Sequence, residues 1–218
     1  LYQSWSEDWG ATFSQEQALS HHSCECCRIA VTQNEKAQPV LMWRQIQAEG
    51  TRDHVISTIK EKNRLAIARR VSHENWAVNA CPHHGPDLAL GDNDQNTGIH
   101  AVWFSGAEDK AGLWYGEVSQ SSDTKSKPEQ FGNLSQQAAH PQIAAFNGLL
   151  MRSWQEFDGT KTMIKLQTSH DGGQSWSQTI DAASTRGSAD YAFLISDQSS
   201  LYIAWHTEKE SYRLIPIS

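Results

Sequence analysis

A tryptophan repeat is the feature that most restricts how this chain can fold. Four short apolar segments each end in a tryptophan followed by a polar loop, and these tryptophans lie 60, 51 and 51 residues apart. They are Trp43, Trp103, Trp154 and Trp205. Each segment is rich in β-branched and aromatic residues, which is typical of a β-strand. A strand repeated about every 50 residues indicates a modular all-β fold.

Further strand-like segments flank each tryptophan strand. The preceding segments are 28–32, 86–90, 141–146 and 191–196, and the following ones are 54–60, 113–119, 163–168 and 212–217. A fourth segment follows in the first three repeats. Four strands per repeat are typical of the blades of a β-propeller. We therefore expect one domain, residues 1–218, with units at about 1–20 (partial), 27–80, 81–138, 139–187 and 188–218 (partial).

A second motif occurs twice. The segments SEDWGATF at 6–13 and SHDGGQSW at 169–176 both fit S-x-D-x-G-x-[ST]-[WF]. This pattern resembles the Asp-box, or BNR repeat, of the sialidase superfamily. The aspartate can accept backbone N–H groups of the turn, glycine allows a positive φ, and the final aromatic packs into the blade. We expect a structural role for these residues, which are Asp8, Gly10, Phe13, Asp171, Gly173 and Trp176.

The resemblance to the sialidase superfamily implies a six-bladed propeller. The strand count is about seventeen, whereas six blades need about twenty-four. We therefore expect roughly the C-terminal four blades of a six-bladed sialidase-like propeller, and a closed four-bladed ring is the alternative.

Composition excludes some functions and favours an exported protein. The net charge of −7 disfavours nucleic-acid binding. No apolar run approaches the ~20 residues of a spanning helix. The chain starts at Leu1, which indicates a removed leader or a piece of a longer product. Four cysteines, an even number, fit an oxidising compartment, so we expect a secreted or periplasmic protein of unknown oligomeric state.

The links that join one blade to the next are expected to surround a single mouth. Antiparallel order places the links from the fourth strand to the next first strand on one face, which is the pocket face in sialidase-like propellers. These links are 21–27, 81–86, 139–141 and 188–191. All four cysteines and five of the ten histidines fall in them.

The cysteines allow three interpretations. Two disulfides, one of them joining 24–27 to Cys81, suit a secreted propeller that needs no cofactor. Alternatively, the thiolates and neighbouring imidazoles bind copper or zinc. The third interpretation is free buried thiols. The candidate metal ligands are Cys24, Cys26, Cys27, Cys81, His83 and His84.

The sequence around these cysteines resembles a branch of exported bacterial sialidase-like proteins. The resemblance rests on CxCC at 24–27, Trp43-Arg44, Arg52-Asp53, Trp76, the CPxxGP segment at 81–86 and Val102-Trp103-Phe104. A sialidase holds a substrate carboxylate with three arginines and uses a tyrosine nucleophile paired with a glutamate. The segment 189–194 resembles the family's A-Y-S-x-L motif, which implies Tyr191 as nucleophile. Asp190 is inserted and Ala192 replaces serine, so Tyr191 can equally be a strand-end residue.

Two functions follow as hypotheses. The first is a propeller that binds a glycan or small anion at the axial pocket through stacking and charged hydrogen bonds. Its candidate ligand-binding residues are Arg44, Arg52, Asp53, His83, His84 and Trp103. The alternatives are an exo-sialidase-type glycoside hydrolase and a Cys/His metal-binding propeller. A pure interaction scaffold is also compatible with the fold.

Overall fold

The fold of the described residues is all-β. The computed structural model describes residues 1–62, 64–92, 98–118, 127–197 and 199–217, and these contain eighteen strands and one short 3₁₀ turn, η1 (Leu134–Gln136). Within the same ranges, no helix is long and apolar enough to span a bilayer.

Most strands belong to four antiparallel sheets in which sequence neighbours pair side by side. The first sheet contains β3 (Ala30–Gln33), β4 (Pro39–Ile46), β5 (Arg52–Glu61) and β6 (Arg64–Leu65), with β7 (Arg69–Arg70) also paired to β5. The second contains β8 (Asp87–Leu90), β9 (Ile99–Ser105), β10 (Gly112–Val118) and β11 (Glu129–Phe131). The third contains β12 (Ala139–Phe146), β13 (Leu149–Phe157), β14 (Thr162–Ser169) and β15 (Ile180–Thr185). The fourth contains β16 (Phe193–Ser196), β17 (Leu201–Thr207) and β18 (Ser211–Ile217).

These sheets correspond to the repeat units seen in the sequence. Each repeat tryptophan lies in the second strand of its sheet, and the strands before and after it pair with that strand. The two N-terminal strands β1 (Tyr2–Gln3) and β2 (Gln17–Ala18) form a separate small sheet. The third strand of the second unit was expected to reach residue 119, which lies outside the described residues.

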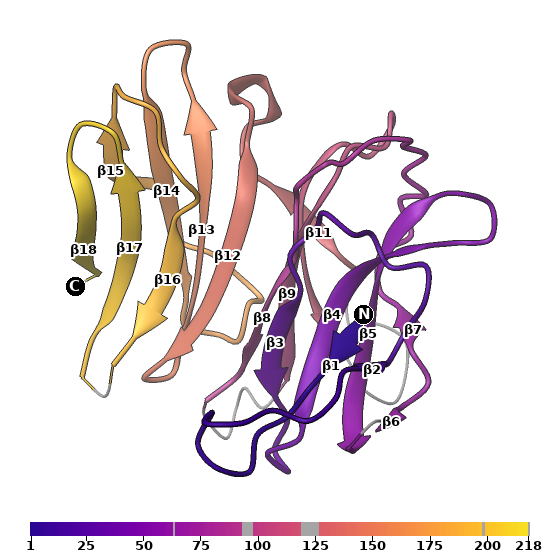
Figure 1. Ribbon diagram of the computed structural model, residues 1–218. Coiled ribbons are helices and arrows are strands. Elements are labelled where there is room, and N and C mark those ends of the chain that lie inside the picture. The colour runs from indigo at the N-terminus through magenta and orange to yellow at the C-terminus, as the bar shows by residue number, and fades with distance from the viewer. Residues whose placement is uncertain (63, 93–97, 119–126, 198, 218) are drawn as a thin grey trace.

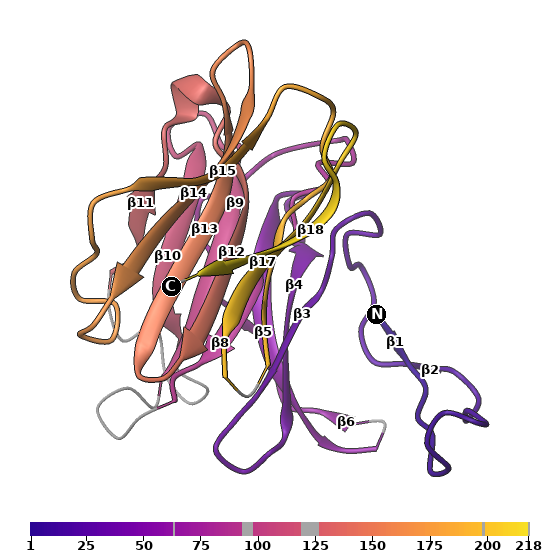
Figure 2. The same cartoon turned by 90° about the vertical axis from the view of Figure 1, so that its left-hand side faces the viewer.

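The first strands of the four sheets lie next to one another at the inside of the molecule. Strand β3 contacts β8, β8 contacts β12, and β12 contacts β16. Figure 1 shows the sheets following each other, from the indigo and violet first sheet to the yellow fourth sheet. Figure 2, turned by 90°, places the small β1–β2 sheet beside the first sheet. Every link from one sheet to the next therefore leads toward the same central region.

The hydrophobic core lies between the sheets. The tryptophans of the second, third and fourth sheets each pack against the preceding sheet. Trp103 packs with Met42 of the first sheet, and Trp154 packs with Leu113 of the second. Trp205 packs with Ile164 of the third sheet. All of these indoles are 2% exposed or less. The repeat therefore encodes contacts between sheets, since a large aromatic side chain gains most when it is fully buried.

The two motif segments form the same hydrogen-bonded turn. In the first, Ser6 Oγ donates to Asp8 Oδ1 at 2.7 Å and Thr12 N donates to Asp8 Oδ1 at 2.9 Å. In the second, Ser175 N donates to Asp171 Oδ1 at 2.9 Å. The hydroxyls of Thr12 and Ser175 hold the pKa of each aspartate at about 2. Every carboxylate oxygen of Asp8 and Asp171 is thus hydrogen-bonded within its own turn.

The aromatic residues that end the two motifs differ in their surroundings. Trp176 contacts Tyr115 of the second sheet edge to face, with ring centroids 5.0 Å apart, and the Arg152 guanidinium lies 4.0 Å from its ring. Phe13 is 65% exposed, so the expectation that it packs into a blade is wrong. Trp176 has a preceding sheet to pack against, whereas no sheet precedes Phe13 in the described chain. Gly10 and Gly173 have φ values of 87° and 85°, as the turn requires.

Replacing Trp205 by alanine is expected to destabilise the fold strongly. The change empties a site between the third and fourth sheets, and large-to-small changes of this kind cost about 3–5 kcal/mol. Urea unfolding followed by circular dichroism measures the loss. The matched control is Trp9→Ala, because Trp9 is fully exposed and its replacement should change stability by less than about 0.5 kcal/mol. Equal losses in both variants would contradict the assignment of the repeat to the core.

Candidate functional site

Side chains from the links between successive sheets meet at the centre of the molecule. The rings of His84 and His140 stack with centroids 4.7 Å apart, and those of His140 and Tyr191 stack at 3.7 Å. At the other end, His84 stacks on Phe104 at 4.1 Å. These four residues, Phe104, His84, His140 and Tyr191, form what we call the axial row. Its members come from the second, third and fourth sheets and the links that precede them.

Arg28, which precedes the first sheet, reaches the end of the axial row. Its guanidinium carbon lies 4.9 Å from the Tyr191 ring centroid and 5.2 Å from that of Phe193. Its backbone is held close to the second link: a Cβ added at Gly85 would lie 2.7 Å from the Cβ of Arg28. A side chain at Gly85 would therefore push Arg28 away, so glycine permits this close approach.

The guanidinium of Arg28 lacks hydrogen-bond acceptors. Its Nε, Nη1 and Nη2 atoms are all buried, and within the described parts of the chain none of them has a partner. Burial lowers the pKa of Arg28 from its ordinary value, while the Asp87 carboxyl and Tyr191 oppose this. A buried cation without acceptors is costly, so the Arg28 guanidinium has free donors for the oxygens of an anion.

The two histidines of the axial row are uncharged at neutral pH. Burial lowers the pKa of His84 to about 4 and that of His140 to about 3, and the positive charge of Arg28 contributes to both shifts. The Nδ1 atoms of both rings are buried without a partner among the described residues. A neutral imidazole offers one donor and one acceptor, so the pair can form hydrogen bonds to the hydroxyls of a ligand.

A carboxyl group lies close to Arg28. Burial raises the pKa of Asp87 to about 6, although the backbone N–H of Ile143 donates to its Oδ2 at 2.9 Å and Arg28 is nearby. Asp87 begins β8, so it lies on an innermost strand. A carboxyl with this pKa is partly protonated in mildly acidic solution, which a general acid requires.

The four cysteines converge next to this region. The sulfurs of Cys24, Cys26 and Cys27 lie within 4.8 Å of one another, with Cys24 Sγ 3.7 Å from Cys26 Sγ and 3.3 Å from Cys27 Sγ. Cys81 contacts Cys26 from the second link. Burial acts to raise the pKa of Cys26, but contacts with the Cys81 thiol and the His83 backbone N–H lower it overall. All four cysteines are free thiols in this structure, and we call them the thiol cluster.

Two arginines flank the thiol cluster. Arg52 Nη1 donates to Cys24 Sγ at 3.3 Å. Arg44 is 1% exposed and donates to the carbonyls of Arg52, His84 and Phe104 at 2.8–3.1 Å. Its Nε lacks a partner in the described part of the chain. Burial lowers the pKa of Arg44, and Cys27 is the group that opposes this most strongly.

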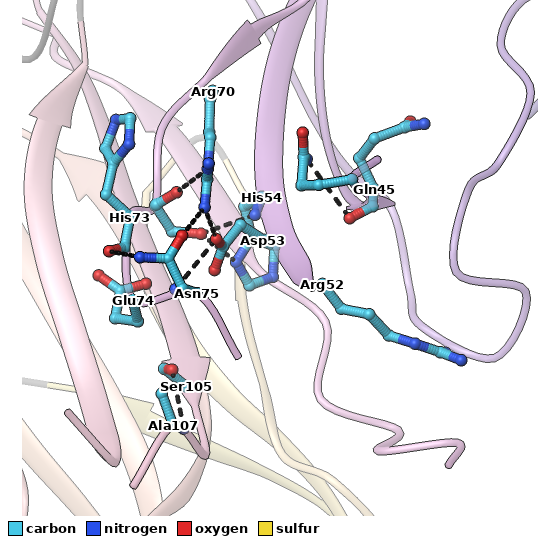
Figure 3. Close-up of polar contacts among 12 residues, drawn as sticks. Gln45, Arg52, Asp53, His54, Arg70, His73, Glu74, Asn75, Ser105 and Ala107 are labelled. Carbon is cyan, nitrogen blue, oxygen red and sulfur yellow. Dashed lines mark hydrogen bonds and ion pairs between the residues drawn. The ribbon is translucent and has the colours of Figure 1, made fainter. Parts of the chain in front are cut away.

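Asp53 belongs to a separate ion-pair network. It is 1% exposed, forms a salt bridge with Arg70 and accepts the backbone N–H of Asn75 at 3.1 Å. Figure 3 shows this network and shows that the side chain of Arg52 extends away from it. Adjacent residues of a strand point to opposite sides, so Arg52 and Asp53 cannot contact one ligand group together.

Described residues of the links between strands line two cavities. The larger, of about 720 Å³, is lined by the β7–β8 and β9–β10 links, including Glu74, Trp76, Glu108 and Lys110. Burial raises the pKa of Glu74, whose Oε2 accepts the N–H of Trp103 at 3.2 Å. The smaller, of about 300 Å³, is lined by Glu25, Arg52 and Cys81 among others.

The predicted ligand-binding residues divide into three groups. Trp103 is 0% exposed and Asp53 is paired internally, so the ligand-contact role predicted for them is corrected: both are structural. Arg44 is enclosed as well, although it contacts both the axial row and the thiol cluster. Arg52 and His83 are accessible and lie beside the thiol cluster.

Of these residues, only His84, together with Tyr191, lies in the axial row. The sequence analysis placed Arg28 at the start of a strand-like segment and gave it no ligand role, and it missed Asp87 and His140 as site residues. These three residues lie in or beside the predicted links, and this position is the feature of the sequence that could have identified them. Which links touch one another is decided by tertiary structure.

No protein-family model matches this sequence, and no curated protein matches it either. Solved structures do match. The Hadza microbial sialidase Hz136 aligns with a TM-score of 0.58 and 10% identity over 87% of this chain and 43% of its own. A GH43 β-1,3-galactosidase with galactodeoxynojirimycin aligns with a TM-score of 0.54 and 13% identity over 88% of this chain and 71% of its own. The GH43_1 enzyme from Xanthomonas citri with xylotriose aligns with a TM-score of 0.55 and 11% identity over 93% of this chain and 74% of its own.

These similarities establish the fold. The chain has the β-propeller fold of glycoside hydrolases, and it spans less than half the length of the sialidase it matches. At 7–13% identity, the likeness carries no assignment of substrate.

The stability of the protein is expected to fall on acidification through the axial histidines. Their folded pKa values lie below the ~6.5 of an unfolded chain, so the unfolded state binds more protons as the pH drops from about 6.5 to about 4. The raised pKa of Asp87 acts in the opposite direction between about 6 and 4. Replacing one histidine isolates its share of the pH dependence.

In the variant His140→Gln, the free energy of unfolding should change less steeply with pH than in the wild type, by up to ~1.4 kcal/mol per pH unit. Urea unfolding at about pH 7, 6 and 5 measures it. The control is His73→Gln, because His73 is exposed. Parallel curves for the wild type and His140→Gln would contradict the neutral, buried state of His140.

Proposed function

We propose that this protein binds an anionic group of a glycan at the axial row. The observation that carries the proposal is Arg28, whose three guanidinium nitrogens are buried without acceptors. A carboxylate or sulfate matches the fork of an arginine and supplies two charge-assisted hydrogen bonds. Tyr191 forms the end of the row next to Arg28 and is 36% exposed, so a ligand reaches Arg28 from its side.

The chemistry around Arg28 favours a sugar as the carrier of the anion. Stacked aromatic rings can face the apolar side of a sugar, and the unpartnered His84 and His140 nitrogens can bind its hydroxyls. Two of the structural neighbours were solved with sugars or sugar mimics bound. The fold likeness is compatible with this function, and the argument itself rests on the unpartnered groups.

A second candidate is hydrolysis of the exo-sialidase type, favoured by the position of Tyr191. It lies under the Arg28 guanidinium, and Asp87, whose pKa of about 6 suits proton donation, lies close to the same guanidinium. A tyrosine nucleophile also needs a glutamate partner, and the contacts of the Tyr191 ring within the described residues are with the His140 ring and the Arg28 guanidinium. Binding therefore remains the leading proposal.

We also propose that the four sheets are part of a six-bladed propeller of an exported protein. Large apolar side chains are exposed on the outermost sheets, where a further blade would cover them. They include Ile29 and Val31 on the first sheet and Phe193, Ile195, Tyr212 and Leu214 on the fourth. The Asp-box identity of the two equivalent turns belongs to the same proposal.

Replacing Arg28 should weaken the binding of acidic sugars selectively. Calorimetric titration with N-acetylneuraminic acid, galacturonic acid and a galactose sulfate, compared with neutral galactose, measures it. A charge-assisted pair contributes about 1.5–3 kcal/mol, so Arg28→Ala should bind about 10–100-fold more weakly and Arg28→Lys should retain part of the affinity.

The matched control is Arg186→Ala, an exposed arginine at the start of the link from β15 to β16. It should bind like the wild type. The proposal fails when none of the acidic sugars binds better than galactose, or when Arg28→Ala binds them as well as the wild type.

The hydrolase candidate is tested with a fluorogenic sialoside. Tyr191→Phe should abolish turnover while binding of N-acetylneuraminic acid remains within about threefold, because the ring and Arg28 remain in place. Full activity in Tyr191→Phe would reject Tyr191 as the nucleophile, and no turnover by the wild type would reject the hydrolase candidate itself.

A further inference from the structure

The structure points to a second site with a different chemistry. We propose that the thiol cluster binds one thiophilic closed-shell metal ion, Zn²⁺ or Cu⁺, through Cys24, Cys26 and Cys27, with Cys81 as a fourth ligand. This site is independent of the glycan proposal, because its ligands are sulfur atoms outside the axial row.

The sulfur positions fit metal coordination. A Zn–S bond of ~2.3 Å places two tetrahedral ligand sulfurs about 3.8 Å apart. Cys24 Sγ lies 3.7 Å from Cys26 Sγ and 3.3 Å from Cys27 Sγ, and the three sulfurs lie within 4.8 Å of one another. Cys81 contacts Cys26 from the neighbouring link. The three sulfurs of the first link are thus placed to share a single ion, and Cys81 contacts one of them from the next link, where it can complete the ligand set.

The charges around the cluster fit as well. Four thiolates with Zn²⁺, or three with Cu⁺, both carry a net charge of −2. Arg44 and Arg52 supply +2, and within the described chain neither has a carboxylate within salt-bridge distance. Arg44 is 99% buried, and its Nε lacks an acceptor. A buried guanidinium of this kind needs a nearby anion, and a metal–thiolate centre provides one.

The site also has an entry route. Arg52 and Cys81 line the cavity of about 300 Å³, so an ion can reach the cluster from solvent. The ligands come from residues 24–27 before the first sheet and from Cys81 before the second. A bound ion would therefore fix these two links to each other, as a structural metal does.

The histidines do not belong to this ligand set in the structure. His84 stacks between Phe104 and His140, and His83 contributes its backbone N–H to Cys26. The described His, Cys, Asp and Glu residues that come close enough to share one ion are the three cysteines of the first link. The Cys/His metal site predicted from the sequence is therefore proposed here with sulfur ligands alone. Sulfur ligands favour Zn²⁺ and Cu⁺ over harder cations.

The proposal is tested on the full chain, purified without oxygen. Thiols are counted after unfolding with and without reductant, and metal content is measured by mass spectrometry. Titration with Co²⁺ reports thiolate coordination through charge-transfer absorption and a tetrahedral site through its visible bands. A Cu⁺ chelator competition and a Zn²⁺ chelator competition then distinguish the two ions. We expect four free thiols without reductant, the same number with reductant, and one metal ion per chain.

The variants separate coordination from folding. Cys26→Ser and Cys27→Ser should each lower metal affinity at least about 100-fold, and Cys81→Ser should weaken it less and reduce the cobalt charge-transfer intensity by one ligand. Glu25→Gln, in the same loop and exposed, is the matched control and should bind like the wild type. Circular dichroism verifies that each variant is folded.

Two results would overturn the proposal. One is reduced, folded protein with four thiols that takes up neither Co²⁺, Zn²⁺ nor Cu⁺ at one equivalent. The other is anaerobically purified protein in which the cysteines are paired as disulfides, which would make the cluster a covalent link. Neither result affects the sugar titrations of Arg28→Ala.

Discussion

The structure depends on the contact between each second-strand tryptophan and the sheet before it. A sheet of three or four short strands has two faces and cannot bury both alone. Trp103, Trp154 and Trp205 each fill the space between neighbouring sheets, together with residues such as Met42 and Ile164. Because this contact recurs from repeat to repeat, each sheet packs against the preceding one in a similar way. The first strands of the sheets therefore come together at the centre.

This arrangement explains why the polar groups of interest lie at the links. A link must cross from the outer strand of one sheet to the inner strand of the next, so successive links meet where the first strands begin. The axial row forms there from one or two residues of each contributing sheet. None of these contacts involves residues close in sequence. Arg28 reaches Tyr191 over more than 160 positions.

Arg44 connects the two proposed sites. Its guanidinium donates to the carbonyls of His84 and Phe104, which belong to the axial row, and its side chain also interacts with Cys27. The thiolates of a metal–thiolate centre in the thiol cluster would outweigh the charge of the ion, place net negative charge next to Arg44 and so favour its present position. Arg44, which holds the backbone of two axial-row residues, would then have a counter-charge. The groups of the axial-row site that contact a ligand would still be Arg28 and the two imidazoles.

The sequence by itself determined the strands, their grouping into sheets and the two aspartate turns, because these depend on local patterns and on a repeat with large aromatic residues. It also identified the links as the place to search, with the cysteines and His84 among their residues. Only the tertiary structure decided which of these side chains meet. Trp103 and Asp53 became structural because burial and a salt bridge with Arg70 involve other strands. Arg28 became the central candidate because the absence of an acceptor is a property of its whole surroundings, which no sequence pattern records.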